Sequence, residues 1–273
     1  MRMLLAFALL PLFAAAQPTE TARDTCEVGR ACVRPVAHEW LFGVGGSNVL
    51  DTYLSPLEYR GPVVSLAHRS NRLARWGGGR VGVEGFYSAR FARLQSPTKD
   101  NKYYEGDLLA GVAWHRVWAV RPSLRLGLGG MAEATAGFTY SANGGNNPAQ
   151  GRLAADLALS ALAEWQFTIR RQHLSLFSQM DVPLAGMAFA PTFGQSYYEI
   201  FALQKRDRNV RFTHPFNAPS LRWITTLRFP LWGATLSVGY MADIRQSDLN
   251  GVKHHTWNHS FVVGYVRRLR LLR

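Results

Sequence analysis

The most constraining feature of the chain is a regular alternation of apolar and polar side chains over Leu153–Ile169. The odd positions are all Leu, Ala, Trp, Phe or Ile, whereas the even positions include Asp156, Ser160 and Glu164. Successive side chains of a strand point to opposite faces of a sheet, so this stretch predicts a strand with one apolar and one polar face. A tilted strand crosses a bilayer with about 9–11 residues, and this one is longer.

The alternation recurs in nine further stretches, two of them weaker, at Trp40–Gly46 and Pro62–Asn71. It predicts an all-β fold, an antiparallel transmembrane β-barrel of about 10 strands. A hairpin within Ala190–Ala218 would make twelve. A soluble β-sandwich also alternates, but its strands are usually 3–10 residues long, and aromatics near the strand ends favour the membrane.

Turns and longer polar connections alternate along the chain, which predicts short periplasmic turns and longer outer loops. The outer loops are expected at Ser96–Lys102, Ser141–Gly151, Ala190–Ala218 and Gln246–His254.

The first residues predict export. Arg2 precedes the apolar run Leu4–Phe13, and Ala14–Ala16 offer small residues for signal peptidase. A buried N-terminal helix is the alternative. We therefore expect a signal peptide at 1–16, a periplasmic segment at 17–37 and a barrel at 38–273 in the cell outer membrane of a Gram-negative bacterium.

The composition fits strands that alternate in a membrane. Hydrophobic residues make up 47% of the chain and charged residues 18%, below the roughly 25% of soluble proteins. The net charge of +13 is spread over strand ends and turns, which argues against nucleic acid as a partner. The expected partners are outer-membrane lipids, lipopolysaccharide and the outer-membrane assembly machinery.

The two cysteines, Cys26 and Cys32, lie close together just after the proposed signal peptide. An oxidising periplasm favours a local disulfide between them. Free thiols or a metal site are the alternatives, but no histidine cluster lies nearby.

Two regions resemble a known family. They are Gly45–Gly61, GGSNVLDTYLSPLEYRG, and a later region with Gly194–Phe201, GQSYYEIF, followed by FTHP at 212–215 and NAPSL at 217–221. This pattern is similar to an uncharacterised family of exported Gram-negative outer-membrane β-barrel proteins. The resemblance implies the barrel fold, and it brings no catalytic residues.

The first of these regions is rich in turn-forming residues, such as Pro56 and the glycines at 45, 46 and 61. Asp51, Tyr53, Glu58 and Tyr59 could order an outer loop. We expect a cap over the barrel mouth, with a ligand-contact surface as the alternative.

His68-Arg69-Ser70-Asn71 is the one motif that suggests chemistry, because residues two apart on a strand share a face. Similar His-x-Ser motifs occur in outer-membrane phospholipase A and lipid A deacylases. His68 could deprotonate Ser70, and Glu84 on the next strand could orient the histidine. A polar strand end is the alternative. His254 and His255 point opposite ways on an extended chain and make a poor chelate, and no metal or cofactor is expected.

Charged residues of both signs occupy the polar faces of the predicted strands. A barrel of this size is narrow, so these side chains should pair across the lumen. We therefore expect a non-enzymatic barrel with a structural or binding role, with a lipid-acting serine hydrolase or a narrow channel as alternatives. The expected lumen residues are Glu84, Arg90, Glu105, Asp107, Arg125, Glu133, Asp156, Glu164, Asp181, Arg222, Arg228, Asp243 and Arg245.

Overall fold

The computed structural model describes residues 35–74, 76, 80–144, 148–205, 208–231 and 233–270. The signal peptide predicted at 1–16 and the cysteines Cys26 and Cys32 lie outside these residues. The elements, in chain order, are β1 (Pro35–Asp51), β2 (Ser55–Leu73), β3 (Val81–Gln95), β4 (Lys102–Arg121), β5 (Leu124–Ser141), β6 (Ala149–Ile169), β7 (Gln172–Phe189), α1 (Tyr197–Phe201), β8 (Val210–Thr213), β9 (Ser220–Leu231), β10 (Ala234–Leu249) and β11 (Val252–Arg270).

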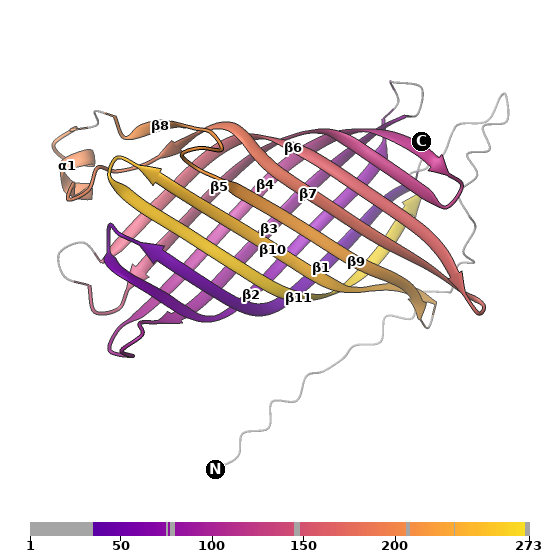
Figure 1. Ribbon diagram of the computed structural model, residues 1–273, viewed down its shortest axis with the longest axis horizontal. Coiled ribbons are helices and arrows are strands. Elements are labelled where there is room, and N and C mark those ends of the chain that lie inside the picture. Colours follow the sequence, from indigo (N-terminus) through magenta and orange to yellow (C-terminus); the bar gives the residue numbers. More distant parts are fainter. Residues whose placement is uncertain are drawn as a thin grey trace, which may run out of the picture.

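Ten of these strands form a closed antiparallel barrel (Figure 1). Each strand pairs with its neighbours along the chain, β1 pairs with β11, and β7 pairs with β9. The short strand β8 adds to the edge of β7 near one end. The prediction of about ten strands is confirmed, and the alternative of twelve is wrong because the Ala190–Ala218 connection contains only one short strand among its described residues.

The exterior of the barrel is apolar around its circumference. Leu108, Leu157 and Phe261 are each about 60% exposed, at 63%, 62% and 58%. Aromatic residues such as Trp40 and Trp165 are exposed toward one end, and Phe138 toward the other. Side chains of this kind face lipid in membrane barrels, so the alternation determines which face of each strand meets the membrane. Among the described residues, no helix is long and apolar enough to cross a membrane.

The barrel has two unlike ends. The terminal end, where β1 begins and β11 finishes, has tight turns such as Arg170-Arg171 between β6 and β7. The loop end holds the connections 96–101, 142–148 and 190–219, the last of which contains α1 and β8 (Figure 1). This is the predicted pattern of short turns at one end and longer loops at the other.

One predicted loop is wrong. Gln246–His254 belongs to a long hairpin in which β10 and β11 continue to a two-residue turn, Asn250-Gly251. Both turn residues have positive φ, 54° and 76°, as a type I′ turn requires. Polarity suggested a loop here, but the Asn-Gly pair is a specific hairpin signal.

The cap predicted over Gly45–Gly61 is also wrong in its main part. Most of this region is paired strand, with Gly45 opposite Val63 and Ser47 opposite Gly61, and only Thr52–Leu54 form a turn. That turn does touch the long connection, because the Tyr53 hydroxyl donates to the Gln195 carbonyl at 2.7 Å.

Candidate functional site

The charged side chains inside the barrel form linked ion pairs at three levels. At the terminal end, Glu39 of β1 binds Arg69 of β2 and Arg228 of β9, the latter at 2.8 Å. The Phe177 ring lies against both guanidinium groups, with Arg69 Cζ 3.6 Å from the ring centroid. All four side chains are buried or nearly so, so this level is closed by packed groups.

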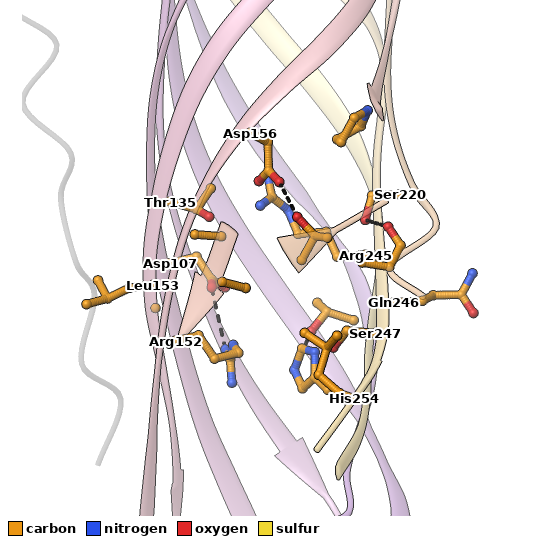
Figure 2. Close-up of a pocket in the computed structure, with 18 of the residues that line it drawn as sticks. Asp107, Thr135, Arg152, Leu153, Asp156, Ser220, Arg245, Gln246, Ser247 and His254 are labelled. Atoms are coloured by element: carbon orange, nitrogen blue, oxygen red, sulfur yellow. Dashed lines mark hydrogen bonds and ion pairs between the residues drawn. The ribbon is translucent and has the colours of Figure 1, made fainter. Parts of the chain in front are cut away.

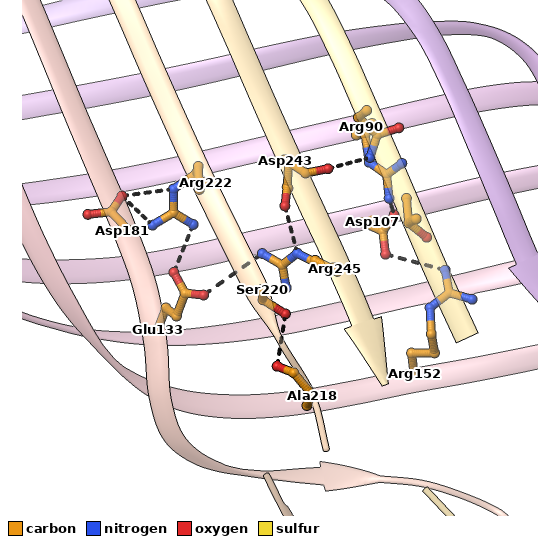
Figure 3. Close-up of polar contacts among 12 residues, drawn as sticks. Arg90, Asp107, Glu133, Arg152, Asp181, Ala218, Ser220, Arg222, Asp243 and Arg245 are labelled. Atoms are coloured by element: carbon orange, nitrogen blue, oxygen red, sulfur yellow. Dashed lines mark hydrogen bonds and ion pairs between the residues drawn. The ribbon is translucent and has the colours of Figure 1, made fainter. Parts of the chain in front are cut away.

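At mid-barrel, Arg222 of β9 bridges two carboxylates, Asp181 and Glu133, at 2.8 Å each (Figure 3). Glu133 also lies 3.8 Å from Arg245, which pairs with Asp243 at 2.9 Å. These contacts join β5, β7, β9 and β10 across the lumen.

Nearer the loop end, Arg90 and Arg152 share the carboxylates Glu105 and Asp107. Figure 3 shows Asp107 between the two arginines. Arg90 lies 2.9 Å from Glu105, and Arg152 lies 3.3 Å from Glu105 and 3.8 Å from Asp51. Shared carboxylates of this kind stabilise buried guanidinium groups, because each charge keeps a partner of opposite sign.

On the terminal-end side of the mid-barrel ion pairs lies an apolar layer, defined by ten buried side chains from nine strands. Phe86 and Met131 are its largest members, and each is 2% exposed. The members of this layer are Leu41, Ala67, Phe86, Leu109, Ala113, Met131, Ala158, Ile224, Met241 and Val262. A buried polar chain passes beside them, because Gln179 accepts from Arg69 at 3.4 Å and donates to Asp181 at 3.2 Å. Packed side chains of both kinds therefore fill the lumen at this level.

Above the layer, the loop-end half of the lumen contains a cavity of about 130 Å³ (Figure 2). In the close-up, Asp107, Arg152 and Asp156 point into the barrel, whereas Leu153 points away from it. Ala190, Thr213 and His214 of the long connection form part of the wall. A similar engineered cavity, of ~150 Å³, holds benzene, so this cavity can take a small organic group.

Two glycines make room for the carboxylates of the wall. A Cβ atom added at Gly137 would lie 2.0 Å from Asp107 Oδ1, and one at Gly186 would lie 2.0 Å from Asp156 Oδ1. A larger residue at either place would displace the carboxylate. The strand opposite each acid therefore helps to position it.

The cavity wall has one more carboxylate than it has arginines: Asp107, Glu133, Asp156, Asp181 and Asp243 against Arg90, Arg152, Arg222 and Arg245. Asp156 is the odd member. It accepts a hydrogen bond from Thr213 Oγ1 at 3.1 Å, and no Lys or Arg of the described residues lies within 4.0 Å of it. The site is thus acidic in a chain whose net charge is +13.

The structure places the expected lumen residues as follows. Nearly all lie inside the barrel, and Arg90, Asp107, Glu133, Asp156, Asp181, Arg222, Asp243 and Arg245 line the cavity. Glu105 is buried beside it, Glu84 is buried deeper, and Glu164 lies 3.7 Å from Arg228 at the terminal end. Arg125 has the inward parity of Met131 but is exposed near the barrel end.

The structure does not bring the hydrolase candidates together. His68 faces outward, where its ring lies 4.4 Å from Trp40 and its Nε2 lies 3.2 Å from His38 Nδ1. Ser70 shares that outward face and donates to the Gly85 carbonyl at 3.5 Å. Glu84 is buried on the lumen side of the sheet, so the wall separates it from the other two. The proposed third group is therefore not available to His68.

Sequence reasoning missed four lumen charges: Glu39, Asp51, Arg69 and Arg152. Glu39 and Arg69 were in phase with the inward positions of their strands, which was a usable signal. Asp51 falls in a region where the sequence predicts an outer loop, and Arg152 falls between a predicted loop and a predicted strand, but both lie within strands of the structure. His254 and His255 lie in β11 opposite Asp51 and Leu50, and only His254 lines the cavity. No three His, Cys, Asp or Glu side chains among the described residues form a metal-binding group.

The chain is similar in fold to several solved outer-membrane proteins. The outer membrane protease OmpT of Escherichia coli matches with 9% identity over 86% of this chain and 97% of that one, at a TM-score of 0.45. The transport unit of the E. coli autotransporter AIDA-I matches with 8% identity over 90% and 92%, at 0.44. Ail, the attachment invasion locus protein of Yersinia pestis, matches with 13% identity over 85% and 98%, at 0.29.

No curated protein matches the chain at a significant level. One family does match, and it covers almost the whole sequence, residues 3–273. Its description is "Protein of unknown function (DUF3316)", and the chain belongs to this family.

Proposed function

We propose that the chain spans the Gram-negative outer membrane as a non-conducting, non-enzymatic barrel and binds a small polar group in the loop-end cavity. The observation that carries this proposal is the blind lumen: a charged cavity lies above a packed apolar layer. Cavities that bind small molecules combine apolar walls with a few placed polar groups, as this one does.

The apolar exterior of the barrel supports outer-membrane lipid as its surroundings. Exposed Leu, Phe and Trp side chains around a closed sheet suit outer-membrane lipid, and the loop end would face lipopolysaccharide. The outer-membrane assembly machinery is a proposed partner during insertion. The outward position of His68 and Ser70 and the inward position of Glu84 support a role without catalysis at that motif.

Cysteine labelling on intact cells tests the blind cavity. In a background with Cys26 and Cys32 replaced by serine, Thr135→Cys places a thiol on the cavity wall, and Thr226→Cys places one at a position that is 0% exposed. We expect a membrane-impermeant maleimide to label position 135 and to leave position 226 unlabelled until the protein is unfolded.

Two results would overturn the proposal. Labelling at both positions would mean an open lumen and would favour the narrow channel. Labelling at neither position would mean that the cavity does not open at the loop end. A thiol in the exposed turn, Thr98→Cys, controls for folding and orientation.

A further inference from the structure

The barrel wall has one short seam, between β7 and β9. These strands pair only over Ser175–Asp181 of β7, up to the Asp181–Arg222 partners. The edge of β7 pairs again with β8 at Gly186–Phe189. Residues 182–185 therefore lie between two pairings, although on their other edge β6 and β7 stay paired as far as Phe189. Pro183 lies in this stretch and has no N–H to offer a neighbour, as befits a strand edge.

The segment on the other side of this gap, residues 217–219, is hydrogen-bonded to β10 instead of β7. The turn that follows β8 closes on itself, since the Ala218 amide donates to the His214 carbonyl at 2.8 Å. The Gln246 amide donates to the Pro219 carbonyl at 3.1 Å, and the Asp248 amide to Asn217 at 2.8 Å. The two borders of the gap thus belong to different parts of the wall.

The cavity reaches the gap from inside. Pro183, Leu184 and Ala185 line it from the β7 border, and Ala218, Ser220 and Leu221 line it from the other border. Leu184 is also 47% exposed on the molecule's surface. Irregular backbone at membrane depth is tolerated where it lines a polar cavity, which fits this arrangement.

The outer surface beside the gap is strongly apolar. Leu157 pairs with Ala185, and Met187 pairs with Phe212 of β8. Leu157, Met187 and Phe212 are 62%, 56% and 60% exposed, and Phe216 at the tip of the turn is 95% exposed. An apolar surface that adjoins a charged cavity matches a molecule that has a charged head and a hydrocarbon tail.

We infer that the cavity opens sideways between β7 and β9 and takes an amphiphile with an ammonium-bearing headgroup. The headgroup lies beside Asp156, and the acyl chain leaves through the gap along Leu184 and Phe212. This inference rests on the proposed binding function and names its ligand class. The positive charge of the headgroup follows from the cavity wall, where each arginine is already paired with a carboxylate and Asp156 has no Lys or Arg of the described residues within 4.0 Å.

The test uses the full mature chain in maltoside micelles and native mass spectrometry. Three probes separate the parts of the ligand: lysophosphatidylethanolamine, lysophosphatidylglycerol with the same acyl chain, and tail-free glycerophosphoethanolamine. We expect the ethanolamine lysolipid to bind at least about tenfold more tightly than either of the others. The glycerol lysolipid lacks the charge-assisted contact, and the tail-free probe lacks the apolar surface of the acyl chain.

Two variants locate the contacts. Asp156→Asn keeps the shape and should lower the affinity for the ethanolamine lysolipid about tenfold, to that of the glycerol lysolipid. Ala185→Trp fills the gap and should lower lysolipid affinity by a similar factor. Ala161→Trp on the lipid face of β6 is the matched control and should leave lysolipid affinity unchanged.

The outcomes separate this inference from the proposed function. Equal binding of the tail-free probe, with no effect of Ala185→Trp, would overturn the side opening and leave the cavity as a binding site. Equal binding of the two lysolipids would overturn the ammonium assignment, and this comparison needs no variant that might misfold. Binding of none of the three probes, together with an unlabelled Thr135→Cys, would overturn both.

Discussion

The lumen is tightly packed at the apolar layer, whereas its loop-end half contains the cavity. Along β6 alone, Ala158 is 5% exposed within the apolar layer, whereas Ala154, four residues away on the same face, lines the cavity. The layer is filled by Phe86, Met131 and smaller residues from the other strands. At the cavity the facing positions carry glycines and charged groups, which leave space. The size of the side chains on the facing strands, and not the alternation along β6, decides whether the lumen is packed or contains a cavity.

Truncating the two largest side chains of the apolar layer should give the largest loss of stability. Phe86→Ala with Met131→Ala should cost about 5–10 kcal/mol of unfolding free energy, from two large-to-small substitutions in a packed layer. Urea unfolding measures this loss. The folded wild type should show no conductance steps in planar bilayers, and the double variant should show none either, because the terminal-end ion pairs around Glu39 stay packed. Steps in the wild type would mean that the packed levels do not close the barrel.

Substitution by arginine should have different effects on stability in the apolar layer, at Ala158, and in the cavity, at Ala154. Ala158→Arg should cost about 4–8 kcal/mol, because it overpacks the layer and buries a charge without a partner. Ala154→Arg should fold, because the cavity offers space and nearby carboxylates. Heat-modifiable migration on gels and urea unfolding measure both. Similar losses for the two variants would remove the distinction between layer and cavity.

Ion pairs in the packed terminal end should contribute more to stability than ion pairs beside the cavity. Glu39→Gln leaves Arg69 and Arg228 with one neutral partner in a packed site and should cost about 3–5 kcal/mol. Asp107→Asn should cost only about 1 kcal/mol, because Asp107 is 22% exposed and Glu105 remains beside Arg90 and Arg152. Urea unfolding of the pair would contradict this ranking if Asp107→Asn were the more damaging.

The smallest effect concerns the contact between the Thr52–Leu54 turn and the long connection. Tyr53→Phe removes the hydrogen bond to Gln195 and should loosen the long connection by about 1 kcal/mol without changing global unfolding. Limited proteolysis within 190–219 measures this.

The same contact should respond to alkaline pH. Burial raises the pKa of Tyr53 to about 12 from 10.0. The contact is therefore fully present below pH 10 and is lost as the pH rises through 12. Cleavage of the wild type that does not change between these pH values would contradict the role of Tyr53.

Much of the fold was readable from the chain. The alternation over Leu153–Ile169 and its repeats indicated the strands, their number and the face that meets lipid, because side-chain direction has a fixed period of two. The ends of strands were read less well. Polarity suggests loops at Asp51 and His254, but both residues lie in strands and face the lumen, where polar side chains find polar partners such as Arg152 and Thr256.

Only the tertiary structure decided the site. Alternation places Asp156 and Glu84 inside, but it does not say that Glu84 is buried away from the cavity. Nor does it say that Asp156 lines the cavity with no Lys or Arg of the described residues within 4.0 Å. It also does not say that His68 and Ser70 lie across the wall from Glu84, or that the β7–β9 seam ends at Asp181. These features depend on register, closure and the volumes of side chains from distant strands, which meet only when the sheet closes on itself.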